Sequence, residues 1–368
     1  GCECAYQIAK RGINVRLFEM KPTKKTAAHK SDLFCELICS NSLKALRIES
    51  AAGLLKEEMR RLDSLLMRCA DKCAVPAGGA LAVNRDDFSA MVTKEIRNNP
   101  LIEVIEKEVT EIPNDAITVI AAGPLASEVL SAEIQKICGG GLSFFDAAAP
   151  IVTAESIDME KAFFASRYDK GGDDAYINCP MNKDEYEAFY EALVSAERTP
   201  LHGVDVQNPK VYEGCMPVEI LAQRGHDTLR FGPMKPVGLR DPRTGHRPWA
   251  VLQLRTENAE KSLYNLVGFQ TNLKFPEQKR VFSMIPALHD AEFIRYGVMH
   301  RNTFLDSPRI LNSDFSMKEN ANIFFAGQIT GVEGYMESGA SGLIAGINAV
   351  RRLNNIETIT LPKETMIG

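Results

Sequence analysis

The run Ile13-Asn14-Val15-Arg16-Leu17-Phe18-Glu19 decides the fold class. Its apolar residues alternate with polar ones, a period typical of a β-strand, and it ends in an acid. A helical stretch that Gly12 terminates precedes it. A helix, a glycine turn and a strand ending in Glu form the second half of a dinucleotide-binding βαβ unit, in which the acid binds a ribose hydroxyl. The run therefore predicts an α/β fold with a nucleotide site at Glu19.

The first residue, Gly1, stands at the distance of about 20 residues that separates the glycines of this unit from its acid. In the motif G-x-G-x-x-G, a strand and two glycines precede the third glycine. We therefore expect Gly1 to be that third glycine, in a sequence that lacks the first strand. The last residues, Lys363 to Gly368, carry no terminating signal, so we expect a C-terminal segment to be missing as well.

Two later strands also end in glycine. Residues 116–122 lead into Gly123, and residues 322–326 lead into Gly327 and a second glycine, Gly331. Near-continuous apolar strands are typical of a parallel sheet buried on both faces. Glycine loops that lead to a helix N-terminus suit an anion or a polarised ring edge. These loops favour a ligand, although a tightly packed βα unit without one is the alternative.

Residues 140–320 differ in character, with more turn signals and short β runs at 249–255 and 263–270. We predict an α/β protein with a Rossmann-like nucleotide-binding domain, which has a doubly wound, mostly parallel sheet. This domain comprises residues 1–140 and 315–368, and an inserted α+β domain comprises residues 141–314. Further expected elements are helices at 54–73, 183–196 and 339–353 and a strand at 100–112.

The composition excludes several classes of protein. The 368 residues are 45% hydrophobic and 25% charged, as in ordinary globular proteins. The net charge of −5 argues against a histone-like protein, but a local basic patch still suffices to bind nucleic acid. The candidate basic runs are Lys21–Lys25, Arg240–Arg247 and Lys274–Arg280, each of which is more often a solvated face. Without a membrane-length apolar run or a secretory leader, and with nine scattered cysteines, we expect a cytoplasmic protein with reduced thiols.

Two cysteines lie in polar or turn-like surroundings. Cys39 is flanked by small polar residues in Glu36–Leu43, which suits an activated thiolate, although a buried structural cysteine is the commoner case. Cys215 lies between Gly214 and Pro217, a turn that exposes a thiol. By contrast, Cys69 and Cys73 share an apolar helix face, where we expect core packing and no metal site.

The stretch Tyr296 to Asn302 places His300 and Arg301 side by side. An imidazole beside a guanidinium suits stacking or anion binding. A surface turn is the other interpretation.

Together these pieces resemble the folate- and FAD-dependent tRNA (uracil-5-)-methyltransferases, within the wider glucose-inhibited-division-A-like flavoprotein family. The similarity covers essentially the whole chain, in the right order. The residues that carry it are Glu-Leu-Ile-Cys-Ser-Asn-Ser at 36–42, Glu-Gly-Cys-Met-Pro at 213–217, Gly-Pro-Met-Lys-Pro-Val-Gly-Leu at 232–239, Tyr-Gly-Val-Met-His-Arg-Asn-Thr at 296–303 and Phe-Phe-Ala-Gly-Gln-Ile-Thr-Gly-Val-Glu-Gly-Tyr at 324–335.

The resemblance implies an enzyme that makes 5-methyluridine in the tRNA T loop. It implies FAD as cofactor, 5,10-methylenetetrahydrofolate as carbon donor and NAD(P)H as reductant, with tRNA and folate as partners and no obligate protein partner. Uracil C5 is a weak nucleophile, so such an enzyme needs a thiolate that adds at C6 and a base that removes the C5 proton. We assign the thiolate to Cys39 and the base to Cys215, and the reverse assignment stays open.

The resemblance also implies which residues hold the cofactor. Gly1 and Glu19 would form the phosphate turn and bind the ribose, and Asn41 and Ser42 would lie near the flavin. Val109, on the strand before the insert, would face the adenine. The remaining cradle residues are Gly123, Gly327, Gln328, Gly331 and Val332. For the substrates, His300 would stack on the pterin, and Arg301 would hold an anion of folate or tRNA.

Three alternatives stay open from the sequence. The first is the related flavoprotein that modifies wobble uridine with carboxymethylaminomethyl groups, which shares the Ala-Gly-Gln motif. The second is a flavin dithiol reductase, against which the lack of C-x-x-C argues. The third is a non-catalytic FAD-bound tRNA-binding factor.

Overall fold

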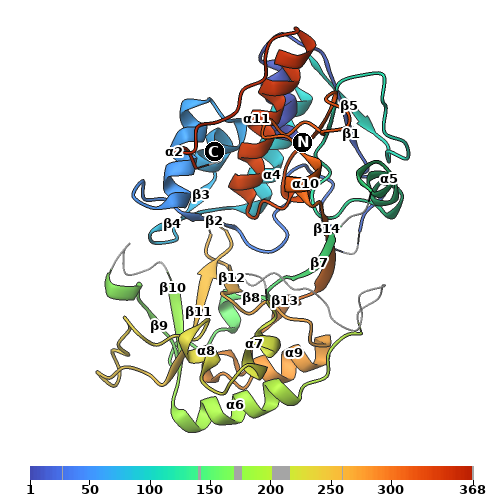
Figure 1. Cartoon of the computed structure of the whole chain (residues 1–368). Helices are drawn as coiled ribbons and strands as arrows, with labels where there is room; N and C mark the ends of the chain where they lie inside the picture. Colours follow the sequence, from blue (N-terminus) through green and yellow to red (C-terminus); the bar gives the residue numbers. More distant parts are fainter. Residues whose placement is uncertain (27, 140–141, 170–175, 201–215, 259, 367–368) are drawn as a thin grey trace.

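The computed structural model describes all residues except 27, 140–141, 170–175, 201–215, 259 and 367–368. For residues 142–147, 169 and 300–303 it describes the backbone alone. The described residues form two lobes, with both ends of the chain in the upper lobe of Figure 1. No helix among them is long and apolar enough to cross a membrane.

The upper lobe contains two pairs of parallel strands. Strand β1 (Val15–Glu19) pairs with β5 (Ile102–Glu106), and β6 (Thr118–Ile120) pairs with β15 (Ile323–Phe325). β5 and β6 are shorter than the ranges 100–112 and 116–122 predicted for them, because their partners offer only five and three residues to pair with. Parallel pairing brings the carboxyl ends of each pair to one edge, as the glycine motifs predict.

Helix α1 (Cys2–Ala9) packs closely against α11 (Tyr335–Leu353), which is orange-red in Figure 1. A Cβ on Gly346 would lie 2.9 Å from the carbonyl oxygen of Cys4, so only glycine permits this approach. The glycine at 346 thus lets another helix, α1, approach α11 closely. α11 also begins at Tyr335, earlier than the predicted Gly339.

The helix predicted over 54–73 is two helices, α2 (Ala51–Arg61) and α3 (Leu65–Lys72). Asp63 between them has φ +56°, outside the helical region. Ser64 caps α3, and the buried carboxylate of Glu3 accepts hydrogen bonds from the Ser64 hydroxyl (2.7 Å) and the Leu66 N–H (2.9 Å). The predicted periodicity is correct, but the break depends on Glu3, far away in the sequence.

The lower lobe is built on an antiparallel sheet. Among the described residues six strands follow the order β13-β8-β12-β11-β10-β9. They are β13 (Phe293–Arg295), β8 (Ile151–Thr153), β12 (Leu263–Leu266), β11 (Ala250–Thr256), β10 (Tyr176–Met181) and β9 (Phe163–Phe164). The sheet shares a core with α6 (Lys183–Ser195), α7 (Val218–Gln223), α8 (Thr228–Phe231) and α9 (Phe275–Phe282). These helices lie below the sheet in Figure 1, the α+β arrangement that was predicted.

Strands β7 (Leu142–Ala147) and β14 (Met299–Phe304) pair antiparallel and join the lobes (Figure 1). After β14, Leu305, Ile310 and Leu311 pack with β6 and β15 in the upper lobe. We therefore propose that the second domain boundary lies near β14, before residue 315. The remaining elements are β2 (Ser42–Ala45), β3 (Ala74–Val75), β4 (Ala80–Val83), α4 (Arg85–Arg97), α5 (Glu128–Cys138) and α10 (Ser307–Ile310).

Candidate active site at the junction of the two lobes

The carboxyl ends of the parallel strands carry several predicted cofactor residues. Glu19 is the last residue of β1, and its Oε1 accepts a hydrogen bond from the Lys21 N–H (3.0 Å). Gly123 and Gly327 follow the ends of β6 and β15. The Ala326 N–H donates to the Ile120 carbonyl (3.0 Å), so the two glycine loops leave the sheet side by side.

These glycines adopt backbone angles that other residues disfavour. The φ angles of Gly123, Gly327 and Gly331 are +69°, +83° and +86°. A Cβ on Gly123 would meet no atom within 4 Å, so this loop borders open space. The Gly327 N–H donates to Ser341 Oγ on α11 (2.7 Å), which fastens its loop to the helix. Gln328 and Val332 in the same loop are half-buried.

Gly1 lies at the same edge, where it is the N-terminal cap of α1 without a side-chain hydrogen bond. A Cβ on Gly1 would lie 3.8 Å from the carbonyl oxygen of Ala121, just past β6. The N–H groups of a helix start favour a phosphate. Val109, however, lies beyond the end of β5 and not on a strand. β5 ends at Glu106, because its partner strand β1 ends at Glu19, opposite Glu106.

Cys39 lies where a loop of the upper lobe meets the start of α11. Its N–H donates to the hydroxyl of Tyr335 (3.0 Å), and its side chain packs beside Ile38 and Leu125. Burial raises the pKa of Tyr335 well above its usual value, and the nearby charge of Cys39 raises it further. Tyr335 therefore stays protonated, and its hydroxyl can donate a hydrogen bond to the half-exposed Cys39 sulfur.

Asn41 and Ser42 follow Cys39, but Asn41 does not face an open cleft. It is fully buried, and its amide nitrogen donates to the Thr256 carbonyl (2.9 Å) of the lower lobe. Its Oδ1 accepts from Arg255 Nε (3.0 Å). Asn41 thus links the two lobes, and Ser42 begins β2. A flavin contact for either residue stays a prediction.

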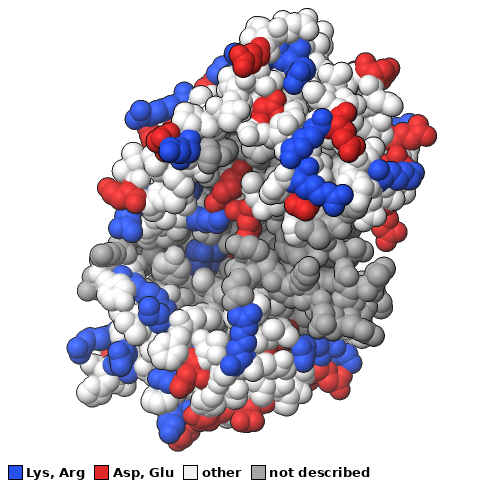
Figure 2. Space-filling view, in the orientation of Figure 1, with Lys and Arg blue, Asp and Glu red and all other residues white. Residues whose placement is uncertain are grey.

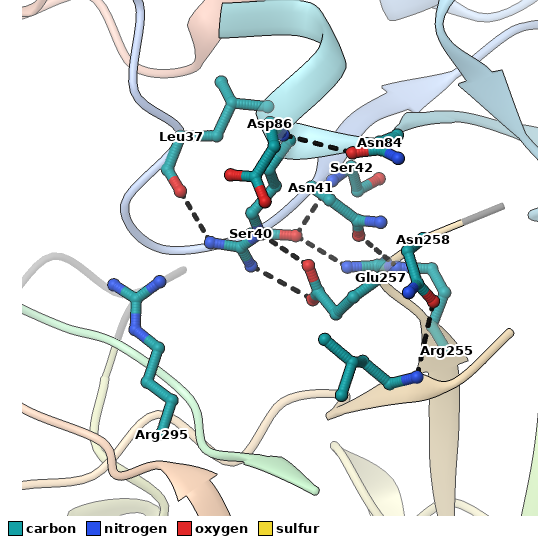
Figure 3. Close-up of polar contacts among 12 residues, drawn as sticks. Leu37, Ser40, Asn41, Ser42, Asn84, Asp86, Arg255, Glu257, Asn258 and Arg295 are labelled. Atoms are coloured by element: carbon teal, nitrogen blue, oxygen red, sulfur yellow. Dashed lines mark hydrogen bonds and ion pairs between the residues drawn. The ribbon is translucent and has the colours of Figure 1, made fainter. Parts of the chain in front are cut away.

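Three arginines contact the loop at 37–41, and Figure 3 labels two of them, Arg255 and Arg295. Arg85, the first residue of α4, donates to Leu37 O (2.5 Å) and forms a two-pronged ion pair with Glu257 (2.5 and 3.0 Å). From the lower lobe, Arg255 donates to Ser40 Oγ (2.6 Å) and Arg295 donates to Ile38 O (3.1 Å). Both lobes therefore hold the loop that carries Cys39.

The three guanidinium groups differ in how their charge is balanced. Burial lowers the pKa of Arg255 and of Arg295. Burial would lower the pKa of Arg85 too, but the ion pair with Glu257 outweighs it and raises that pKa. Among the described residues, Arg255 and Arg295 form no ion pair of their own. The surroundings of the loop thus carry an excess of positive charge, which favours a thiolate.

Sequence reasoning missed Arg85, Arg255, Arg295, Glu257 and Tyr335. One signal existed for Arg255. It is the only charged residue in β11, a strand in which every residue is buried. A charge that a sequence places inside such a strand needs a specific partner. The other residues stand in ordinary polar stretches and form no motif of their own.

Three predicted residues cannot be located in detail. Cys215 lies outside the described residues. His300 and Arg301 lie on β14, paired with Asp146 and Phe145, so the surface-turn interpretation is wrong. Their side chains are outside the description, and their roles stay predictions. Cys69 and Cys73 lie in the core as predicted, and the described residues contain no group of three that could hold a metal.

Comparison with known proteins gives the family. The profile of the family described as "Glucose inhibited division protein A" matches residues 1–357. The chain belongs to this family. Two family relatives, from Desulfitobacterium hafniense and Acetivibrio thermocellus, are named methylenetetrahydrofolate–tRNA-(uracil-5-)-methyltransferase TrmFO. Each is 60% identical over all of this chain and 84% of the relative. A third, from Lactobacillus gasseri, carries the same name and is 57% identical. The predicted family is confirmed.

A solved member of the glucose inhibited division protein A family supports the fold. The structure of Aquifex aeolicus GidA matches with a TM-score of 0.74 over all of this chain and 65% of that chain. At 16% identity this likeness concerns the fold alone. It confirms the predicted fold class, a Rossmann-like domain with an inserted α+β part.

Proposed function

We propose that this protein methylates C5 of uridine in tRNA, with methylenetetrahydrofolate as the carbon donor and FAD as cofactor. The observation that carries the proposal is 57–60% identity, over the entire chain, to relatives named for this reaction. The wobble-uridine alternative is not favoured, because the likeness to GidA is only 16% in sequence. The T loop as target and NAD(P)H as reductant follow from the family resemblance.

The described residues fit FAD. The helix start at Gly1 and the loop at Gly123 meet at one edge, where a Cβ on Gly123 would project into open space. Glu19 ends the neighbouring strand, which suits a ribose, and the Gly327–Gly331 loop presents backbone to the same edge. When bound there, FAD supplies the hydride that turns the transferred carbon into a methyl group.

Cys39 is the residue to which we assign the attack on the base. Its thiolate adds to C6 of uracil, which makes C5 nucleophilic enough to bond to the methylene carbon of the folate. A base then removes the C5 proton while the carbon–nitrogen bond to the folate breaks, and tetrahydrofolate leaves. The thiolate departs once the exocyclic carbon has received a hydride, and this restores the ring. We assign the proton removal to Cys215. The target uridine must leave the stacked T loop to reach the site.

Arg85 and Tyr335 position and activate Cys39 in this proposal. The positive charge of Arg85 and a donated hydrogen bond from Tyr335 both favour the thiolate over the thiol. Arg85 also fixes the backbone on the N-terminal side of Cys39 through Leu37 O (2.5 Å) and Ile38 O (3.2 Å). These contacts hold the sulfur in one place while the base approaches.

The test is to incubate the purified protein with unmodified tRNA, NAD(P)H and methylenetetrahydrofolate and to measure 5-methyluridine by nucleoside mass spectrometry. A parallel reaction contains S-adenosylmethionine in place of the folate. We expect 5-methyluridine with the folate only. If a flavin-loaded protein makes none, the proposal is wrong.

A further inference from the structure

The three basic runs of the sequence differ in how their charges are used. In Lys21–Lys25, Lys24 pairs with Glu108 and Lys25 pairs with Asp32, both at 2.7 Å, and Lys21 is buried. This run is therefore neutralised within the protein.

The run Lys274–Arg280 is neutralised in large part. Lys274 pairs with Glu197 (2.5 Å) and Arg280 pairs with Glu277 (2.6 Å). Only Lys279 of its three basic residues has no ion pair among the described residues.

The loop at 235–247, between α8 and β11, keeps its charge. It contains four Lys or Arg residues and one acid, Asp241, in a protein of net charge −5. Asp241 is buried and pairs with Arg243 (2.6 Å). Within the described part of the chain, Lys235, Arg240 and Arg247 are exposed and have no ion pair. Figure 2 shows blue side chains gathered at the lower left, where this loop lies in Figure 1.

The loop is held in one shape by its own hydrogen bonds. The Asp241 N–H donates to the His246 carbonyl (2.9 Å), and the Gly245 N–H donates back to the Asp241 carbonyl (2.8 Å). Arg243 Nη1 reaches Glu160 O (2.5 Å), which ties the loop to the sheet lobe. An ordered loop loses little conformational entropy when it binds a partner.

An exposed aromatic ring stands beside this loop. Tyr168 is 57% exposed, and its ring covers Gly238, where a Cβ would lie 2.9 Å from the ring. The Tyr168 N–H donates to the Gly238 carbonyl (3.0 Å), and Arg167 donates to Val237 O (2.8 Å). One side of the ring is thus supported by the loop while the rest faces solvent.

Cations without ion pairs beside an exposed aromatic ring suit the binding of a nucleic acid strand. Phosphates bind the cations, and a base stacks on the ring. We propose that Lys235, Arg240 and Arg247 bind phosphates of the tRNA and that an unpaired base stacks on Tyr168. This surface, the 235–247 loop with Tyr168, rests on the proposed function for the identity of the RNA. The 235–247 loop belongs to the lower lobe, whereas Cys39 lies on a loop of the upper lobe, so we assign this surface to binding and not to the chemistry.

The test measures binding of unmodified tRNA at several salt concentrations, together with KM and kcat for methylation. In the variant Lys235→Gln/Arg240→Gln/Arg247→Gln we expect tRNA affinity to fall roughly tenfold or more at low salt. The slope of log affinity against log salt should become shallower by about 2 to 3. KM for tRNA should rise while kcat at saturating tRNA stays unchanged.

The matched control is Lys274→Gln/Lys279→Gln/Arg280→Gln, which removes the same charge from the same lobe. It should keep the wild-type salt slope. Tyr168→Leu should weaken binding about fivefold or more and Tyr168→Phe should not, because only the first removes the ring. The proposal of this tRNA-binding surface would be wrong if the two triple variants lowered tRNA affinity equally, or if the first variant did not lower it.

Failure of this surface can be told apart from failure of the proposed function. If the wild-type protein binds tRNA through the 235–247 loop but makes no 5-methyluridine, the proposed reaction is wrong and the proposed tRNA-binding surface still holds. If the protein methylates tRNA but the variant Lys235→Gln/Arg240→Gln/Arg247→Gln keeps full tRNA affinity, only the proposed tRNA-binding surface is wrong.

Discussion

The loop around Cys39 and the helix face around Cys69 place a thiol in opposite surroundings. Cys69 lies on α3 and is 1% exposed, and burial raises its pKa to about 12. Cys39 is half-exposed beside the Tyr335 hydroxyl and the Arg85 guanidinium. The chemistry available to a cysteine thus depends on the groups around its sulfur, and the comparison makes Cys39 the candidate nucleophile.

The largest expected effect comes from removing the two thiols in turn. Cys39→Ala should lower kcat for methylation by at least about a thousandfold, because it removes the thiol to which we assign the attack on C6. Cys69→Ala should leave kcat within about twofold of wild type and cost roughly 1 kcal/mol of stability. Steady-state kinetics and urea unfolding of both variants measure this. Equal activity of the two variants would show that Cys39 is no more important for methylation than the buried Cys69.

The next effect concerns the ion pair beside the Cys39 loop. Arg85→Gln leaves Glu257 buried without its partner, so the free energy of unfolding should fall by about 3–5 kcal/mol. Alkylation of Cys39 by iodoacetamide should also slow at a given pH, since one of the positive charges that favour the thiolate is gone.

Two variants separate stability from activation at this pair. Arg85→Lys keeps the charge and should restore much of the alkylation rate. Arg85→Gln/Glu257→Gln should recover part of the stability without recovering the rate. If the double variant restores both, Arg85 acts on the fold alone.

A third prediction uses the pH dependence of thiol reactivity in the wild-type protein. With a pKa of about 12, only about one in ten thousand Cys69 side chains is a thiolate at pH 8, and burial likewise raises the pKa of Cys138 to about 11. Both should resist alkylation at pH 8 and react more as the pH rises. Cys39, which is partly exposed beside Arg85, should already be labelled at pH 8. Peptide mass spectrometry after brief alkylation gives the order of labelling, and simultaneous labelling of Cys39 and Cys69 would contradict it.

The smallest effect should follow from removing one hydroxyl. Tyr335→Phe removes the acceptor of the Cys39 N–H and costs about 1 kcal/mol of local stability. The alkylation rate of Cys39 should fall several-fold, with the overall fold unchanged. Tyr186→Phe is a control, because the Tyr186 hydroxyl donates to His226 O in the other lobe (2.6 Å). A change of the Cys39 rate in this control would show that the effect is not local.

The features that sequence predicted are those that local patterns encode. The alternation before Glu19 and the glycines at 123, 327 and 331 each depend on a few neighbouring residues, and the strands and positive φ angles agree with them. Cys39 was singled out by its flanking polar residues. In each case the physical requirement, a period of two or a backbone angle that favours glycine, lies within one short stretch.

The contacts that sequence missed join residues far apart in the chain. Arg85 meets Leu37 across 48 residues, and Arg255 meets Asn41 across 214. The break at Asp63 depends in the same way on Glu3, 61 residues before Ser64. No local pattern specifies such pairs. These partners meet only when the whole chain has folded, within the upper lobe for Arg85 and Glu3 and between the lobes for Arg255.

The central claim, that Cys39 bonds to C6 of the target uracil, has a direct test. Unmodified tRNA transcribed with 5-fluorouridine carries a C5 fluorine that a base cannot remove as a proton, so the adduct with the thiolate persists. The protein is incubated with this tRNA, the folate and NAD(P)H, digested, and its crosslinked peptide identified by mass spectrometry. The account predicts a nucleotide on Cys39 and no adduct in Cys39→Ala. An adduct on Cys215 in the wild-type protein would contradict it.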